Sequence, residues 1–224
     1  MHIVGIDIGG TFTDVVAYDA ATRQITAAKA LTTRGDESAG VLACLEEIAV
    51  PREAIERVVH GTTIGTNAIL ERRGAKTAIV TTNGFRDLLE IGRTRRMAPN
   101  TLFDLSFRKP DPIVPRPLRF DIPERVDAAG KVLKPLDEAA VRQIVPTLLE
   151  QGVDAVAICF LHSYIRAAHE DRTAAILKEK SNDIFVSLSH EIVPEYREFE
   201  RLTTTVLNAY IGPLLDKYIS QLEE

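Results

Sequence analysis

Residues 3–16 limit the possible folds of this chain more than any other segment. They form an apolar run that turns through Gly9 and Gly10 and returns as a second apolar run. Two β-branched runs separated by so short a turn predict an antiparallel β-hairpin. Neither glycine has a Cβ, so the backbone of the turn can approach a ligand closely or adopt positive φ. We therefore expect a hairpin whose turn is shaped for a ligand.

Polar residues around this turn indicate a phosphate ligand with magnesium. Successive N–H groups in a Gly-Gly turn can form an anion-binding concavity, and the hydroxyls of Thr11 and Thr13 can donate to phosphate oxygens. Asp7 precedes the turn and could hold a hydrated Mg²⁺, which prefers a carboxylate plus waters. The alternative is an ordinary Gly-Gly hairpin with a solvated aspartate. A P-loop and a dinucleotide fingerprint are excluded, because neither glycine motif occurs in the chain.

The composition is that of a globular protein. The chain has 224 residues, 45% of them hydrophobic and 26% charged, enough for one large domain or two small lobes. The net charge of −5 favours no nucleic-acid partner. Cys44 and Cys159 lie in apolar patterns, which predicts a reducing compartment without disulfides. We find no signal peptide and no apolar stretch of membrane-spanning length, so a cytoplasmic protein with no membrane partner is expected.

The first half of the chain is expected to combine short strands with helices. Hydrophobic alternation predicts strands at about 2–9, 12–19 and 24–33, and the short turns between them predict an antiparallel meander. A helix over about 36–49 follows, and further strands near 57–60 and 77–81 are expected beside the meander. This order predicts an α/β fold of the ribonuclease-H-like kind, one half of an actin-like ATPase fold.

The second half adds an irregular insertion and a long terminal helix. Prolines and arginines concentrate between about 93 and 124, which predicts an irregular segment with an edge strand near 118–122. The other expected elements are helices at about 137–152 and 167–180, strands at about 154–160 and 184–188, and a helix over 195–224. We expect one nucleotide-phosphate-binding domain over 1–190, with the helix of 191–224 leading to a second half.

The terminal helix carries an apolar face near its end. The members of this face are Leu214, Leu215, Tyr218 and Leu222. An exposed apolar stripe of that length is an interaction surface or a liability. We therefore expect another chain to cover this face, or the helix end to fray.

A second polar segment is the loop of residues 60–67, where a predicted strand enters a helix. Its candidate site residues are His60, Thr62, Thr63 and Asn67. Free N–H groups at a helix N-terminus favour anions. Helix capping alone would explain one or two of these polar residues. We expect the loop to face a ligand, because functional residues concentrate on loops held by a rigid scaffold.

A third polar segment, residues 189–201, contains the candidate residues His190 and Glu191. A zincin motif is excluded because no second histidine follows at the required spacing. The alternative interpretation is a solvated helix face with ion pairs between successive turns. Basic side chains also cluster around the start of the insertion, where a solubilising loop would explain them, as would contact with a substrate carboxylate, a phosphate or a partner subunit. These side chains are Arg86, Arg93, Arg95 and Arg96.

Together these segments resemble a known family. The matching motifs, in chain order, are Ile6–Asp14, His60–Thr63 with Thr66–Ala68, Gly84–Asp87, Phe160–Tyr164, and Ser189–Ile192 with Asn208–Tyr210. The combination resembles the N-terminal part of the hydantoinase A / 5-oxoprolinase family, and acetone-carboxylase-type subunits are similar. The resemblance spans nearly the whole chain.

The resemblance implies ATP-dependent opening of a cyclic amide, such as a hydantoin or 5-oxoproline, through a phosphorylated imidate. It implies that Gly9, Gly10, Thr11 and Thr13 bind the phosphates of ATP and that Asp7 binds Mg²⁺. The loop of 60–67 and the pair His190 and Glu191 would then lie near the reacting groups as catalytic candidates.

Members of this family are longer than this chain and carry a second actin-like half. The resemblance therefore implies a second domain or subunit, of the hydantoinase B kind, and predicts that the isolated chain is inactive. Two other functions stay open. One is a sugar or small-acid kinase that uses the same hairpin, and the other is a non-catalytic, partner-binding subunit of a carboxylase-type complex.

Overall fold

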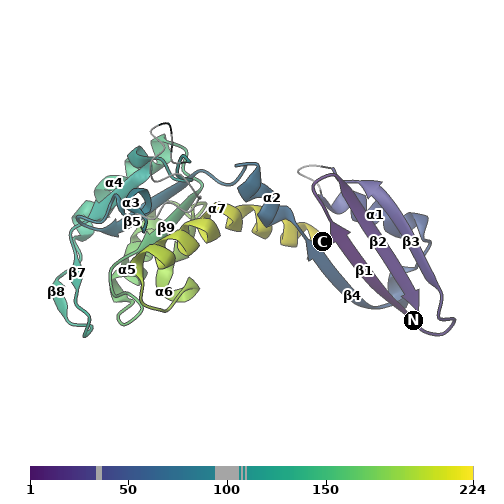
Figure 1. Ribbon diagram of the computed structural model, residues 1–224. Helices are drawn as coiled ribbons and strands as arrows, with labels where there is room; N and C mark the ends of the chain where they lie inside the picture. The colour runs from purple at the N-terminus through teal and green to yellow at the C-terminus, as the bar shows by residue number, and fades with distance from the viewer. Residues whose placement is uncertain (34–36, 94–105, 107, 109, 224) are drawn as a thin grey trace. The chain divides into compact units, whose positions relative to one another are not determined.

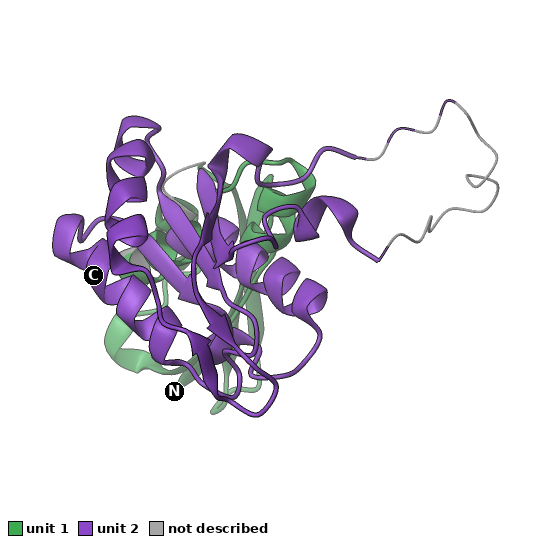
Figure 2. Ribbon diagram, turned by 90° about the vertical axis from the view of Figure 1, so that its left-hand side faces the viewer, with its two compact units in different colours: residues 1–74, 214–224 green, residues 75–213 purple. Residues whose placement is uncertain are grey.

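The computed structural model describes residues 1–33, 37–93, 106, 108 and 110–223. They form two compact units, one of residues 1–74 and 214–224 and the other of residues 75–213 (Figure 2). Residues 1–190, predicted as one domain, therefore contribute to both units, and the boundary at residue 190 remains a prediction. No helix in the described ranges is long and apolar enough to cross a membrane.

The first unit is built on a four-stranded sheet (Figure 1). Its strands are β1 (His2–Ile8), β2 (Phe12–Asp19), β3 (Ile25–Leu31) and β4 (Ile55–Thr62), in the order β3-β2-β1-β4. The predicted antiparallel meander of β1, β2 and β3 is confirmed, and β4 runs parallel to β1. The other elements of this unit are α1 (Glu37–Glu47), η1 (Arg52–Ala54) and α2 (Ile64–Leu70).

The core of the first unit follows the alternation of the hairpin. Val4, Ile6 and Ile8 point inward from β1, while the intervening Asp7 is exposed. Buried residues of β2, β3, α1 and the end of the chain complete the cluster. They are Val15, Ala17, Ala28, Val41, Cys44 and Tyr218.

Tyr218 corrects the expectation for the terminal helix. It is only 3% exposed and packs in the core of the first unit, so that part of the apolar face is covered by the chain itself. Leu214 and Leu215 are half-buried, and the side chain of Leu222 lies outside the described ranges. The expectation that another chain covers the face, or that it frays, is therefore wrong for Tyr218.

The second unit contains a parallel sheet. Its strands are β5 (Thr77–Thr82), β6 (Arg119–Ile122), β9 (Ala155–Cys159) and β10 (Phe185–Leu188), in the order β10-β9-β5-β6. A separate hairpin pairs β7 (Arg125–Val126) with β8 (Val132–Lys134). The helices are α3 (Leu88–Ile91), η2 (Arg116–Leu118), α4 (Glu138–Glu150), α5 (Ala168–Lys180), α6 (Ser189–Ile192) and α7 (Glu198–Glu223), of which α7 extends into the first unit.

The partners of β5 differ from the prediction. The strand expected beside the meander pairs instead with β6 and β9, in parallel on both sides. Every residue of β5 is buried, which is typical of a central parallel strand covered on both faces. The predicted helices and strands from residue 137 onward are confirmed, and the carboxylate of Asp137 caps α4 by accepting from Ala140 N at 3.0 Å.

The insertion predicted over about 93–124 falls largely outside the described residues, because 94–105, 107 and 109 are not described. Its predicted edge strand is confirmed, since β6 lies at the edge of the parallel sheet. The two cysteines are buried and free, as the apolar patterns predicted.

Candidate functional site

The turn between β1 and β2 and the start of α2 form the candidate site of the first unit. In the sheet register Asp7 faces Gly61 of β4, and Ile8 faces Thr62. Because β1 and β4 are parallel, their carboxyl ends meet at one edge, which brings the Gly-Gly turn beside the loop of residues 60–67. The predicted residues of these two segments thus come together.

Neighbouring atoms lie close to both glycines. A Cβ on Gly10 would lie 2.9 Å from Asn67 Nδ2, and one on Gly9 would lie 3.2 Å from Phe12 O. Both distances are shorter than ordinary van der Waals contacts. Neither glycine adopts positive φ. The presence of glycine at these two positions is therefore explained by the close approach of neighbouring atoms and not by a left-handed backbone conformation.

Thr11 and Thr13 have different surroundings. Thr11 is exposed at the turn, whereas Thr13 is fully buried and its hydroxyl lies 3.1 Å from the Thr32 hydroxyl. Thr32 in turn donates to Gly9 O at 3.0 Å, so these hydroxyls hold the turn from inside. Thr13 and the buried Val15 are two residues apart on β2, and side chains two residues apart on a strand lie on the same face. This spacing is the signal in the sequence that Thr13 points inward.

The loop of residues 60–67 combines helix capping with a face toward the turn. Ile64 N donates to Thr62 Oγ1 at 3.2 Å, which satisfies one free N–H group at the start of α2. Asn67 Nδ2 donates to Thr63 Oγ1 at 3.0 Å, and the same amide lies against Gly10. Capping therefore explains Thr62, whereas the Thr63 hydroxyl binds the Asn67 amide and makes no capping hydrogen bond. Asn67 is the side chain of this loop that reaches the turn.

A shallow cavity of about 160 Å³ lies at this junction. Its walls are Gly9, Gly10, Thr32, Ile64, Asn67, Ala68, Glu71, Arg73 and Leu214. Arg73, which pairs with Glu71 at 3.3 Å, supplies a cation to the wall. Sequence reasoning missed Thr32 and Arg73, because only the folded chain brings them to the turn.

His60 is held by the end of the chain. The hydroxyl of Tyr218 is hydrogen-bonded to His60 Nε2, and the two ring centroids are 5.4 Å apart. Partial burial lowers the pKa of His60, and the nearby carboxylate of Asp7 opposes that shift. The imidazole is therefore biased toward its neutral form, which can accept a hydrogen bond.

Asp7 is the acidic side chain at the turn. It is exposed, and no group of three or more His, Cys, Asp or Glu side chains in the described ranges is arranged to hold a metal ion. A single carboxylate suits Mg²⁺, which keeps several waters and binds through one or two carboxylates. The single exposed carboxylate of Asp7 thus fits a hydrated Mg²⁺.

His190 and Glu191 belong to the second unit, in α6. Glu191 is exposed, whereas His190 contacts the fully buried Glu170. The Glu170 carboxylate accepts from His190 N at 3.0 Å and lies 2.7 Å from His190 Nδ1. It also accepts from Ser189 Oγ at 2.6 Å and from Phe160 N at 2.9 Å. This carboxylate therefore joins α6 to the end of β9.

The contact with Glu170 predicts a pH-dependent stability. The hydrogen bond to Glu170 raises the pKa of His190, and the charges of Glu170, Asp171 and Glu191 act in the same direction. A raised folded-state pKa gives stability that is complete below about pH 6.5, the ordinary histidine pKa, and that is lost as pH rises through the folded-state pKa. His190→Gln should therefore lower Tm more at pH 5.5 than at pH 9.

Thermal unfolding of both proteins across this pH range measures the effect, with His2→Gln as the matched control. Each unit of pKa shift corresponds to about 1.4 kcal/mol. A His190→Gln difference in Tm that stays constant with pH would contradict the assignment.

The chain has the mixed α/β fold described above, and the sequence comparisons identify its family. The family described as the hydantoinase/oxoprolinase N-terminal region matches residues 3–181. The chain belongs to this family, and the resemblance found in the sequence is confirmed.

Individual relatives support the same assignment. The chain is 40% identical to an uncharacterized protein of Methanocaldococcus jannaschii and 36% identical to the caprolactamase subunit alpha of Pseudomonas jessenii. These matches cover 96% and 98% of the chain but 32% of each relative. The chain therefore spans about a third of the length of these relatives.

Solved structures agree with the fold of the chain. The ATP-dependent caprolactamase of Pseudomonas jessenii matches with a TM-score of 0.86 and 34% identity over 99% of the chain and 33% of that structure. A nucleotide-free acetone carboxylase matches with a TM-score of 0.86 and 27% identity over 100% of the chain and 34% of that structure. The relatives thus include ATP-dependent enzymes that act on different substrates.

Proposed function

We propose that this chain is the N-terminal, phosphate-binding part of an ATP-dependent enzyme that opens cyclic amides. The observation that supports the proposal is the close approach of the Asn67 amide to Gly10 in the glycine turn. This turn lies at the edge of the sheet where the Asp7 side chain is exposed. The ATP-dependent caprolactamase among the relatives supports a cyclic amide as the substrate.

The proposal assigns a role to each part of the turn. The backbone N–H group of Gly10 and the exposed hydroxyl of Thr11 would bind phosphate oxygens, whereas the N–H group of Gly9 donates to Phe12 O at 2.9 Å and would support the turn. Asp7 would hold Mg²⁺ through its waters. Thr13 would act through Thr32, whose hydroxyl bonds the Gly9 carbonyl and fixes the turn.

The neighbouring loop would position the substrate. His60 is a catalytic candidate of this loop, and its hydrogen bond to the Tyr218 hydroxyl through Nε2 would fix the orientation of its ring. Thr62 and Thr63 would hold the start of α2, and Asn67 would orient the turn. His190 and Glu191 remain catalytic candidates in the second unit, where the contact of His190 with Glu170 also gives it a structural role.

The chemistry suits a site without an activated nucleophile. An unactivated amide resists water because its nitrogen is a poor leaving group. When bound, ATP would supply the phosphoryl group that converts the amide oxygen into part of a phosphorylated imidate, which water can attack. Phosphoryl transfer depends mainly on positioning and on charge neutralisation, and the turn and Asp7 would provide both. The turn would thus belong to an actin-like nucleotide site completed by a second domain or subunit.

The test is ADP formation by a complete enzyme that contains this chain. We expect ADP release to depend on a cyclic amide, such as a hydantoin, 5-oxoproline or caprolactam, with one ring-opened acid formed for each ADP. ADP release that requires a ketone and bicarbonate would overturn the amide proposal in favour of carboxylation, which the acetone carboxylase similarity makes the second candidate. A phosphorylated sugar as the product would identify a kinase instead.

A further inference from the structure

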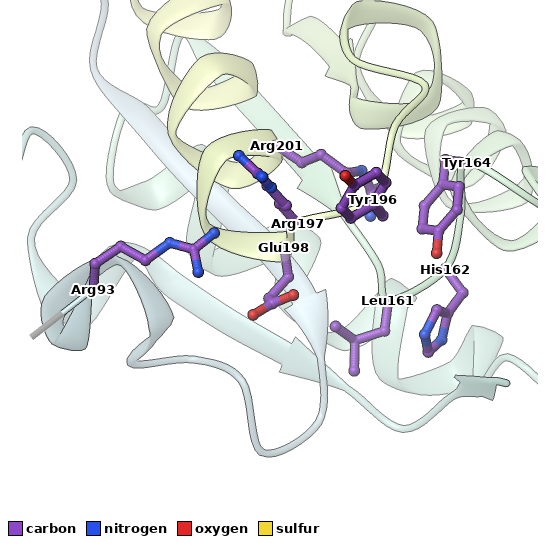
Figure 3. A pocket seen from close by; sticks show the side chains of 8 residues that line it. All are labelled: Arg93, Leu161, His162, Tyr164, Tyr196, Arg197, Glu198 and Arg201. Atoms are coloured by element: carbon purple, nitrogen blue, oxygen red, sulfur yellow. The ribbon is translucent and has the colours of Figure 1, made fainter. Parts of the chain in front are cut away.

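The second unit contains a cavity that the proposed phosphate site does not use. Its volume is about 260 Å³, and it lies between the residues that follow β9 and the beginning of α7 (Figure 3). Its walls are Arg93, Leu161, His162, Tyr164, Tyr196, Arg197, Glu198 and Arg201. The carboxyl ends of parallel strands are the usual place for ligands in α/β sheets.

One wall of the cavity contains a buried cation. Arg201 is only 1% exposed, and its guanidinium is hydrogen-bonded to the hydroxyls of Ser163 and Ser189. Its Nε is buried and has no hydrogen-bond partner within the described part of the chain. An unsatisfied buried donor costs roughly 1–3 kcal/mol, so the protein does not use the full hydrogen-bonding capacity of this guanidinium.

The backbone at the cavity is strained. His162 and Arg197 have φ values of 58° and 82°, in the left-handed region that non-glycine residues rarely adopt. They come from the two segments that meet at the cavity, and both side chains line it. Such strain persists where the surrounding structure enforces it, and it concentrates at ligand sites.

The charges leave one cation for a ligand. Arg93 donates to Glu200 through Nε at 2.9 Å, and Arg201 lies 3.9 Å from Glu170. Arg197 has no ion pair with any described residue, and it is exposed at the wall of the cavity. Glu198, the carboxylate in the wall, disfavours a highly charged anion. Arg197 is therefore the cation of the wall that a ligand can pair with, and Glu198 beside it limits that ligand to a low negative charge.

The remaining walls favour an organic body. Leu161 supplies an aliphatic surface, and the rings of Tyr164 and Tyr196 make cation–π contacts with the guanidinium groups of Arg201 and Arg197. The Tyr164 ring lies 5.2 Å from the Arg201 guanidinium carbon, and the Tyr196 ring lies 5.5 Å from that of Arg197. A planar guanidinium matches a carboxylate through two parallel hydrogen bonds, while Leu161 and the rings can cover apolar atoms.

We propose that this cavity binds a small organic monocarboxylate, with Arg197 on the carboxylate and Leu161 and the tyrosine rings against its apolar body. The proposal concerns binding alone, so it needs neither ATP nor turnover. A negative result would leave the proposed phosphate chemistry untouched, and failure of that chemistry would leave this site untouched.

Matched small molecules test the proposal on the full chain. The probes are 5-oxoproline, cyclopentanecarboxylate, 2-pyrrolidinone and inorganic phosphate, with binding measured by calorimetry and located by NMR shifts of residues 161–164 and 196–198. The first two carry a carboxylate on a five-membered ring, and 2-pyrrolidinone is the lactam without it. At this cavity we expect both carboxylates to bind at least tenfold more tightly than 2-pyrrolidinone or phosphate.

Two exposed residues provide the variants. Arg197→Gln should weaken carboxylate binding by about tenfold, the loss expected for a charge-assisted hydrogen bond. Glu198→Gln should strengthen it several-fold, because a competing negative charge is removed. Arg166→Gln is the matched control, since Arg166 is an exposed arginine of the same unit outside the cavity wall.

The proposal is overturned if, at the cavity as located by NMR shifts of residues 161–164 and 196–198, 2-pyrrolidinone binds as tightly as 5-oxoproline, phosphate binds more tightly than either carboxylate, or neither carboxylate binds. Unchanged affinity in Arg197→Gln would also overturn it. Circular dichroism verifies that the variants are folded, and the gain expected for Glu198→Gln cannot be mistaken for unfolding.

Discussion

Asp7→Ala should lower Mg²⁺-dependent ATP turnover of a complete enzyme containing this chain by on the order of 100-fold or more. Asp7 is the exposed carboxylate at the end of β1, beside the glycine turn. On the proposed function, removing Asp7 takes away the carboxylate that would hold Mg²⁺ and leaves the phosphate charge without full neutralisation. The fold should be retained, because the side chain points away from the core between Ile6 and Ile8.

Asp14→Ala is the matched control for this experiment. Asp14 faces Asp7 across the hairpin and pairs with Lys29 at 2.8 Å on the surface. Exposed pairs of this kind contribute about 1 kcal/mol or less, so Asp14→Ala should leave turnover nearly unchanged. Normal turnover in a folded Asp7→Ala protein would remove the metal-binding role from Asp7.

Glu170→Gln should destabilise the second unit by roughly 3–5 kcal/mol, the cost of removing one partner from a buried ionic network. Glu170 is fully buried and accepts hydrogen bonds from Phe160 N and from Ser189 and His190 of α6. Arg201, 3.9 Å away, would lose its compensating charge. The glutamine amide would also direct a donor toward groups that are themselves donors.

Urea unfolding measures this loss, with Glu179→Gln as the control on the same helix, α5. Glu179 is half-exposed and pairs with Arg142 at 3.1 Å and with Arg172 at 3.5 Å. Its replacement should cost about 1 kcal/mol or less. Equal unfolding midpoints for the two variants would show that the buried network does not stabilise the unit.

The hairpin of β1 and β2 shows how much of the local structure hydrophobic alternation predicts. Its period of two places Val4, Ile6 and Ile8 inward and Asp7 outward, so the strands and the exposed carboxylate were both predictable. The same period places Thr13 inward with Val15, where it supports the turn from behind. The sequence therefore identified the turn, but the direction of each hydroxyl depended on its position along the strand.

Strand partners were less predictable than strands. The strand near 77–81 was expected from its apolar run, and β5 confirms it. A fully apolar run indicates that a strand is buried on both faces, but it does not indicate which strands pair with it. Packing against β6 and β9, which lie far along the chain, decided that β5 belongs to the parallel sheet.

The sequence by itself determined the hairpin, most of the longer helices and strands, and the family, because these depend on residues close together along the chain. It did not predict the short elements α3, β7, β8 and α6. The tertiary structure decided which residues converge. It brought Tyr218 to His60 and placed Arg197 and Arg201 beside His162. Such contacts join segments separated by long stretches of chain, and they are selected by burial and charge compensation across the whole unit, which local periodicity does not encode.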